Sequence, residues 1–198
     1  MSKKVIIIGS GVAGLASAIR LSSNGYSVTV FESNTFVGGK ISEIRKKGYR
    51  FDTGPSLFTM PKLIDDLVKI GYKNGTNKFD YKKIDVTCRY FFDDGIVLNA
   101  YSDNKRFINE VANKIKVEPN LIRKYLNYVA FLFKSTNKIF IEKSLHKLST
   151  YLSFEVLFSI FKIPFLSIFK SMNETNTRRL KNPKLIKIFN RYATYNGS

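Results

Sequence analysis

Three glycines and one acidic residue near the start of the chain have types and spacing that suit dinucleotide binding. Gly9, Gly11 and Gly14 form a G-x-G-x-x-G pattern, and Glu32 follows Gly14 by 18 residues. In this pattern the first glycine permits a tight turn, the second lets the backbone approach a pyrophosphate, and the third lets a helix pack closely. An acid about 20 residues later accepts hydrogen bonds from ribose hydroxyls and disfavours a 2′-phosphate. The pattern predicts a dinucleotide site that does not take NADP.

The segments around these residues have the order that a βαβ unit requires. The β-branched run Val5–Ile8 predicts a strand buried on both faces. Apolar residues at helical spacing follow it, and residues 26–31 alternate as in a second strand that ends at the acid. The helix begins near Val12 and Ala13, whose N–H groups would point toward the phosphates. A plain glycine-rich turn is the alternative, and the complete order of elements favours the nucleotide site.

Two more glycine-containing segments follow. Gly38 and Gly39 mark a loop that either bends sharply or meets a ligand closely, and Lys40 behind them could meet a phosphate. A plain turn explains this loop equally well in isolation, but its place just after the ribose-binding acid favours the ligand. Gly54 and Pro55 break a later strand, and their backbone would lie against the same ligand.

The balance of charge is strongly basic, with a formal net charge of +18 over 198 residues. Such a charge favours acidic surfaces, which include anionic lipid, nucleic acid and anionic ligands. The lysines are spread along the whole chain, so a general compositional bias is an equally open explanation. No nucleic-acid motif is present, and we expect no nucleic-acid partner.

Cysteine and histidine usage limits other kinds of chemistry. Cys88 is the single cysteine of these 198 residues, which favours a reducing compartment, and its β-like surroundings predict a small core residue. The single histidine, His146, leaves no spacing typical of a zinc site, and we expect no metal. No signal peptide and no apolar run of about 20 residues is visible, so we expect a cytoplasmic location.

The pattern changes near residue 84, where the parallel βαβ order gives way to a hairpin and helices. Two hairpins are predicted, with turns at 46–48 and at 93–95. Four helices are predicted to begin at Pro61, Asp103, Pro119 and Pro183. The apolar positions of the first of these helices, such as Leu63, are expected to lie in the core.

Residues 144–172 are rich in Phe, Leu and Ile, interrupted by lysines. The segment is too charged to span a bilayer. It would either lie at a membrane interface, with lysines reaching the head groups, or form a helical pair in a core. Both interpretations stay open.

Several stretches together resemble the bacterial phytoene desaturases and related carotenoid oxidoreductases, which belong to the FAD-dependent, amine-oxidase-like group. The stretches are VIIIGSGVAGLASAIRL, FESNTFVGGKIS and GYRFDTGPSLFTMP, and the tail NPKLIKIFNRYATYNGS looks like part of the family's substrate domain. The first motif is shared by many flavoproteins, whereas the GG-K and Asp-x-Gly-Pro motifs narrow the resemblance to the group. The family is considerably longer, so we expect an N-terminal portion of such a protein.

The resemblance implies an α/β fold class. Residues 1–83 would be the N-terminal part of a Rossmann-like FAD-binding domain, and residues 84–198 part of a mostly helical α+β domain that faces substrate or membrane. It also implies FAD as the cofactor, with contacts at Gly9, Gly11, Val12, Ala13, Gly14, Glu32, Gly38, Gly39, Lys40, Gly54 and Pro55. The family usually has Arg where this chain has Lys40, and Lys keeps the charge but loses the bidentate fork.

The implied reaction is the desaturation of a carotenoid precursor such as phytoene, in which FAD accepts two electrons from a C–C single bond flanked by double bonds. The implied partners are an apolar polyene substrate and, peripherally, the cytoplasmic face of an anionic membrane. No catalytic residue is predicted. Three alternatives stay open: another carotenoid or retinoid oxidoreductase or isomerase, an inactive remnant, and a basic nucleic-acid-binding module.

Overall fold

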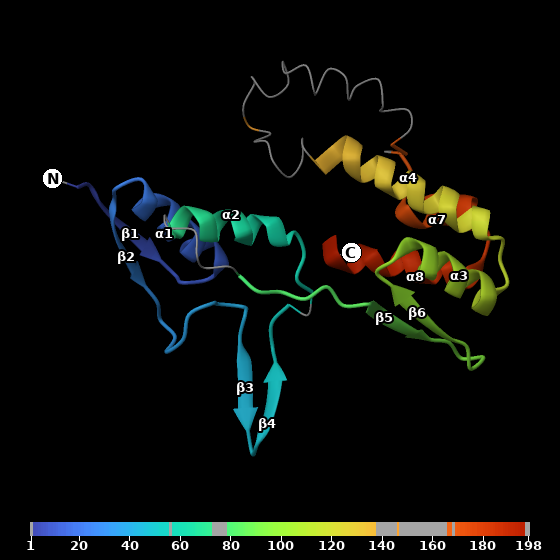
Figure 1. Cartoon of the computed structure of the whole chain (residues 1–198), viewed down its shortest axis with the longest axis horizontal. Helices are drawn as coiled ribbons and strands as arrows, with labels where there is room; N and C mark the ends of the chain where they lie inside the picture. The colour runs from blue at the N-terminus through green and yellow to red at the C-terminus, as the bar shows by residue number, and fades with distance from the viewer. Residues whose placement is uncertain are drawn as a thin grey trace. The chain divides into compact units, whose positions relative to one another are not determined.

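The computed structural model describes residues 2–55, 57–72, 79–137 and 169–196, together with 146, 166 and 167. The chain divides into two compact units, Met1–Lys82 and Lys83–Ser198, which are described separately (Figure 1). Most of the segment 144–172, for which we predicted a membrane interface or a helical pair, lies outside the described residues.

The first unit begins with the predicted βαβ arrangement. Strand β1 (Lys4–Ile8) pairs in parallel with strand β2 (Ser27–Phe31), and helix α1 (Val12–Ser23) connects them. Helix α2 (Pro61–Gly71) begins at its proline, as predicted, and packs against α1 (Figure 1). This arrangement brings the carboxyl ends of both strands to one edge, where ligands bind in sheets of this kind.

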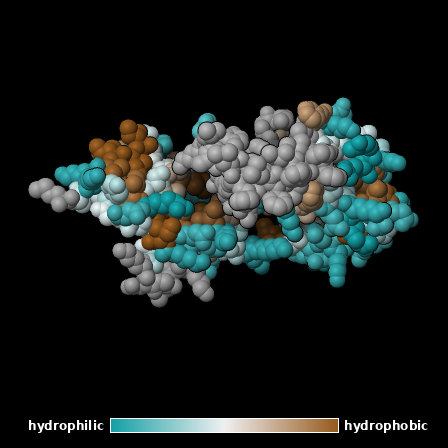
Figure 2. Space-filling view, turned by 90° about the horizontal axis from the view of Figure 1, so that it is seen from above, coloured by the Kyte–Doolittle hydropathy of each residue, from teal (hydrophilic) through white to brown (hydrophobic). Residues whose placement is uncertain are grey.

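Burial in this unit is lower than the sequence suggested. The prediction that β1 is buried on both faces is wrong, because its residues alternate between exposed and half-buried and Ile8 is 90% exposed. The prediction of a core position for Leu63 is also wrong, because this residue is 50% exposed and no residue of α2 is buried. In the described part of the unit, β1 pairs only with β2, and α1 packs on this pair. Hydrophobic side chains consequently gather on the surface at the end that contains β1 and β2 (Figure 2).

The first predicted hairpin is confirmed. Strands β3 (Glu43–Lys46) and β4 (Tyr49–Asp52) are antiparallel, and Lys47 and Gly48 form the turn between them. Both turn residues have positive φ, at 50° and 81°, which is typical of two-residue hairpin turns.

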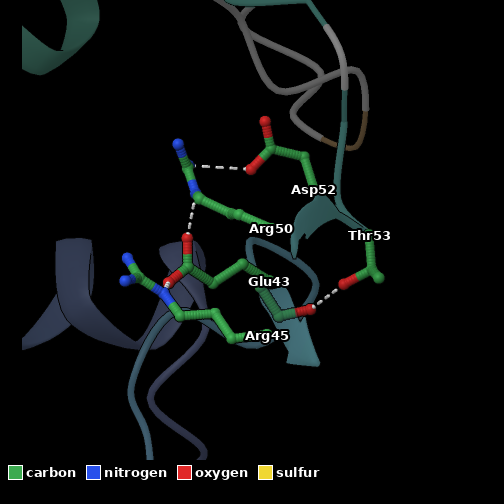
Figure 3. Close-up of polar contacts among 6 residues, drawn as sticks. Glu43, Arg45, Arg50, Asp52 and Thr53 are labelled. Carbon is green, nitrogen blue, oxygen red and sulfur yellow. Dashed lines mark hydrogen bonds and ion pairs between the residues drawn. The ribbon is translucent and has the colours of Figure 1, made fainter. Parts of the chain in front are cut away.

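Charged side chains join the two strands of this hairpin (Figure 3). Glu43 accepts hydrogen bonds from Arg45 on its own strand and from Arg50 on the neighbouring strand. Arg50 also donates to Asp52 at 2.9 Å. The bonds from Arg45, and then those from Arg50, lower the pKa of Glu43. All four side chains are solvent-accessible, so the network adds little stability.

The second unit contains the second predicted hairpin and a set of helices. Strands β5 (Val86–Phe91) and β6 (Val97–Tyr101) are antiparallel. Asp103 caps helix α3 (Asn104–Ile115) by accepting a hydrogen bond from the backbone N–H of Arg106 at 2.8 Å. Helices α4 and α8 begin at the predicted prolines. The elements are β5 (Val86–Phe91), β6 (Val97–Tyr101), α3 (Asn104–Ile115), α4 (Pro119–Asn137), α7 (Met172–Leu180), α8 (Pro183–Asn190) and the 3-10 helix η3 (Arg191–Asn196).

Among the described residues, the buried apolar core lies in this second unit. It combines β6 with faces of α3, α4, α7 and α8, and Cys88 packs half-buried beside it. The core residues are Leu98, Ala100, Phe107, Ile108, Val111, Ile115, Ile122, Tyr125, Leu180, Leu185 and Ile188. On α3 the buried side chains Phe107, Val111 and Ile115 recur at helical spacing on one face.

Two kinds of feature are absent from the described residues. None of the helices there is both long enough and apolar enough to cross a bilayer. In the same residues, no three His, Cys, Asp or Glu side chains are grouped as metal ligands would be.

Candidate dinucleotide-binding site

The glycine motif forms the turn between β1 and α1. Gly9 has a φ of +95°, which favours glycine, and its N–H donates to the carbonyl of Phe31 at 2.7 Å. The turn is therefore tied to the end of β2. A Cβ on Gly14 would lie 2.0 Å from the carbonyl oxygen of Gly9, so only glycine lets α1 begin this close to the turn.

The first turn of α1 offers donors to an anion. Gly11 is the N-cap, and the helical hydrogen bonds begin with Leu15 N–H donating to its carbonyl at 2.9 Å. The N–H groups of Val12, Ala13 and Gly14 precede that bond and have no partner within the helix. A Cβ on Gly11 would meet no atom within 4 Å, so the space beside this residue is open. Open space next to a helix N-terminus suits a phosphate.

The second glycine pair lies directly against the first motif. Gly38 donates its N–H to the carbonyl of Ser10 at 2.9 Å and forms a parallel bridge with Gly11. A Cβ on Gly39 would lie 3.1 Å from the Cα of Gly11. Both glycines have positive φ, at 113° and 61°. The structure therefore brings together two segments that the sequence separates by more than 20 residues.

The third glycine segment joins the second. A Cβ on Gly54 would lie 2.5 Å from the carbonyl oxygen of Lys40. The hydroxyl groups of Ser42 and Thr53 are 2.7 Å apart, which closes the base of the β3–β4 hairpin (Figure 3). Pro55 follows Gly54 and is exposed, as is Lys40. Three backbone segments predicted to contact one ligand thus form a continuous set of contacts.

Glu32, the predicted ribose-binding acid, follows the last residue of β2. Its Oε2 accepts from the backbone N–H and the hydroxyl of Ser10, each at 2.7 Å. Its Oε1 accepts from the backbone N–H and the side-chain amide of Asn34, each at 2.9 Å. These bonds, led by the backbone N–H of Asn34 and then by the bonds from Ser10, lower the pKa of Glu32 to about 2. The carboxylate is therefore ionised at neutral pH.

The carboxylate borders a hollow at the carboxyl ends of β1 and β2. The hollow has a volume of about 340 Å³ and is lined by Ile8, Gly9, Phe31, Glu32 and Ser33. It lies where parallel strands of such a unit bind their ligands.

Ser10 and Asn34 are two functional candidates that our sequence analysis missed. Ser10 occupies the variable position between the first two motif glycines, and Asn34 follows the acid by two residues. The sequence shows a serine beside the turn glycine and an asparagine two residues after the acid. Their convergence on one carboxylate depends on the pairing of β1 with β2, which brings residues 22 positions apart into contact.

Comparison with known proteins agrees with this geometry. The family described as NAD(P)-binding Rossmann-like domain matches residues 7–69, which include every glycine discussed above. The fold of this segment is therefore Rossmann-like.

The chain is also 47% identical, over 99% of its length, to a 1-hydroxycarotenoid 3,4-desaturase from Flavobacterium sp. (strain P99-3). The chain spans about 40% of the length of the curated relatives that it matches. Two 4,4'-diaponeurosporene oxygenases are similar at lower identity. The protein from Staphylococcus aureus (strain Mu50 / ATCC 700699) is 30% identical over all of this chain, and the protein from Staphylococcus haemolyticus (strain JCSC1435) is 28% identical over 99% of it. Each alignment covers 39% of the relative. The solved structure of an oxidoreductase from Methanosarcina mazei aligns with a TM-score of 0.39 and 17% sequence identity. The alignment covers 98% of this chain and 50% of the Methanosarcina chain, and a likeness this low supports no argument.

The residues of this site fit the adenosine diphosphate part of a dinucleotide. The open space beside Gly11 and the donors at the start of α1 suit the diphosphate. The ionised Glu32 beside the hollow suits ribose hydroxyls.

Proposed function

We propose that the protein to which this chain belongs is an FAD-dependent oxidoreductase that desaturates a carotenoid. In this proposal the chain holds the adenosine diphosphate half of FAD. The observation that supports it best is the ionised carboxylate of Glu32, held at the edge of β2 beside the open glycine turn. A plain glycine-rich turn has no need of a fully hydrogen-bonded acid at this position.

The additional glycine segments favour FAD over NAD as the cofactor that the site binds. The Rossmann motif alone is common to both cofactors. Here Gly38 and Gly39 pack on the motif, and Gly54 packs on the segment that follows them. This extended backbone surface suits a longer ligand, and the family resemblance also favours a flavin.

The roles of the chain's own residues follow from their positions. The N–H groups of Val12, Ala13 and Gly14 would bind the diphosphate, and Gly11 would let it approach the backbone. Glu32 would accept hydrogen bonds from the adenosine ribose. When bound, a flavin would supply a hydride acceptor for one carbon of a CH–CH bond, and loss of a proton from the neighbouring carbon to solvent would complete the double bond.

The nature of the substrate is a further part of the proposal. The 47% identical relative is named for desaturation of a 1-hydroxycarotenoid, whereas the 28–30% identical relatives are named as oxygenases. The higher identity favours desaturation over oxygenation. It also makes a hydroxylated carotenoid a stronger candidate than phytoene, the substrate we predicted from sequence. A peripheral location on the cytoplasmic face of an anionic membrane remains a proposal, supported by the net charge of +18 and by the apolar character of carotenoids.

The proposal can be tested with the purified full-length protein, supplied with FAD and with liposomes that contain either phytoene or a 1-hydroxycarotenoid. We expect the absorption spectrum of the carotenoid to shift to longer wavelength as a conjugated double bond is added, and we expect no shift with Gly11→Val. Incorporation of an oxygen atom without a new double bond would favour the oxygenase alternative. Bound FAD with neither product, from either carotenoid, would contradict the desaturase assignment.

A further inference from the structure

The carboxylate of Glu32 has no free hydrogen-bonding capacity in this structure. A carboxylate accepts about four hydrogen bonds, two at each oxygen. Oε2 accepts two from Ser10, and Oε1 accepts two from Asn34 at the distances given above and a longer one, at 3.4 Å, from the Ser33 hydroxyl. Each oxygen therefore accepts one backbone donor and at least one side-chain donor. A ribose hydroxyl can reach this carboxylate only by replacing one of these donors.

The donors on Oε2 are fixed by their surroundings. Ser10 is 2% exposed, and its backbone is held by the bond from Gly38 N–H to its carbonyl and by the tie between Gly9 and Phe31. If the Ser10 hydroxyl turned away from Glu32, a buried polar group would lose its partner, which is costly.

The side-chain donor on Oε1 is in a different situation. Asn34 is exposed, and its side-chain amide bonds Oε1 from the solvent side of the loop after β2. An amide released there can hydrogen-bond to water instead, so its replacement by another donor costs little. The backbone N–H of Asn34 is part of the loop and would remain on Oε1.

We propose that Ser10 is a positioning residue that fixes the Glu32 carboxylate, and that Oε1 is the oxygen offered to the adenosine ribose. A ribose hydroxyl displaces the Asn34 side-chain amide from Oε1, while both bonds from Ser10 remain. This inference rests on the proposed function, because it requires an adenosine nucleotide in the hollow. It assigns opposite roles to two side chains that bond the same carboxylate.

The test compares three variants of the full chain, with ADP as the probe and calorimetry at pH 7 as the measurement. Ser10→Ala should weaken ADP binding about tenfold, since it loses one hydrogen bond to a charged group. Asn34→Ala should bind ADP as tightly as the unmodified chain or up to about threefold more tightly, because a competing donor is gone. Ser23→Ala, which removes a serine hydroxyl from the far end of α1, is the matched control and should not change the affinity.

A pH profile separates positioning from a general structural effect. In the unmodified chain the pKa of Glu32 is about 2, so Glu32 stays ionised from pH 7 down to about pH 4. The change of ADP affinity over that range then reflects only the titration of the ADP phosphate, which is the same for every variant. In Ser10→Ala the pKa of Glu32 should rise toward the ordinary value of 4.5, because two of its causes are bonds from Ser10 and the variant loses the hydroxyl one. The affinity of this variant should therefore begin to fall at a higher pH. A purely structural effect would lower affinity equally at every pH.

The outcomes distinguish the two levels of the proposal. An unmodified chain that binds neither ADP nor FAD would overturn the proposed function itself. Normal ADP binding with an unchanged affinity and pH profile in Ser10→Ala would overturn the positioning role alone. A tenfold loss in Asn34→Ala would overturn the displacement. If Ser10→Ala does not fold, NMR of the unmodified chain decides: the side-chain amide signals of Asn34 should shift when ADP is added, and unchanged signals would refute the displacement.

Discussion

Substitution of Gly11 by alanine should separate nucleotide binding from folding. Gly11 has a φ of −66° and a ψ of 174°, which alanine adopts without strain. Its added methyl group would meet no protein atom within 4 Å. The methyl would instead enter the open space beside the N-terminus of α1, where the motif places a pyrophosphate.

The expected effect on stability is small because two contributions oppose each other. Replacing a glycine at a compatible position stabilises a protein by about 0.4–1 kcal/mol through the unfolded state. Alanine is a poorer N-cap than glycine, which costs a similar amount at the start of α1. The free energy of unfolding should therefore change by less than about 1 kcal/mol.

The expected effect on binding is large. A ligand displaced by the methyl would lose hydrogen bonds from the helix N-terminus, each of which contributes about 1.5–3 kcal/mol when one partner is charged. Loss of two such bonds corresponds to a decrease in affinity of more than about a hundredfold.

Gly14→Ala is the informative comparison. Its methyl would lie 2.0 Å from the carbonyl oxygen of Gly9, so the turn or the helix must move. We expect a loss of about 1–3 kcal/mol of stability as well as of binding. Calorimetry with FAD and urea unfolding of the Gly11 and Gly14 variants measure both quantities. Affinity retained within threefold in Gly11→Ala would refute the placement of the diphosphate.

Three further predictions concern single groups. Because the pKa of Glu32 is lowered to about 2, its contribution to stability is fully present above about pH 4.5 and is lost as the pH falls toward 2. Acid unfolding of Glu32→Gln, compared with that of the unmodified chain, will detect this loss. Tyr125→Phe removes a buried hydrogen bond of 2.6 Å to Asn176 and should lower the free energy of unfolding by about 1–3 kcal/mol in urea, whereas an unchanged midpoint would contradict this bond. Leu98→Ala, at a fully buried position, should cost about 2–5 kcal/mol, and Ile44→Ala, at a 55% exposed position, should cost less than about 0.5 kcal/mol; equal losses would contradict the described core.

Local features of the fold were predictable because their causes are local. Glycines that need positive φ, prolines that begin helices and the cap at Asp103 act within a few residues. For this reason the βαβ order, both hairpins and the starts of α1, α2, α3, α4 and α8 were correctly predicted, whereas α7 was not predicted.

Features that depend on distant parts of the chain were not predictable in this way. The apolar run of β1 suggests burial on both faces, but exposure depends on which strands and helices surround it, and Ile8 is open in the described residues. The roles proposed for Ser10 and Asn34 depend on the parallel pairing of two strands, which no single segment of sequence reveals. The contact between Gly11 and Gly39 depends on tertiary structure in the same way.

Binding of the adenosine diphosphate part of FAD by this chain can be tested through the flavin content of the purified full-length protein, measured by absorbance after reconstitution with FAD. We expect about one FAD per chain in the unmodified protein and none in Gly11→Val. A folded protein that remains free of flavin after reconstitution, or a Gly11→Val variant that retains it, would show that the glycine turn does not bind this cofactor.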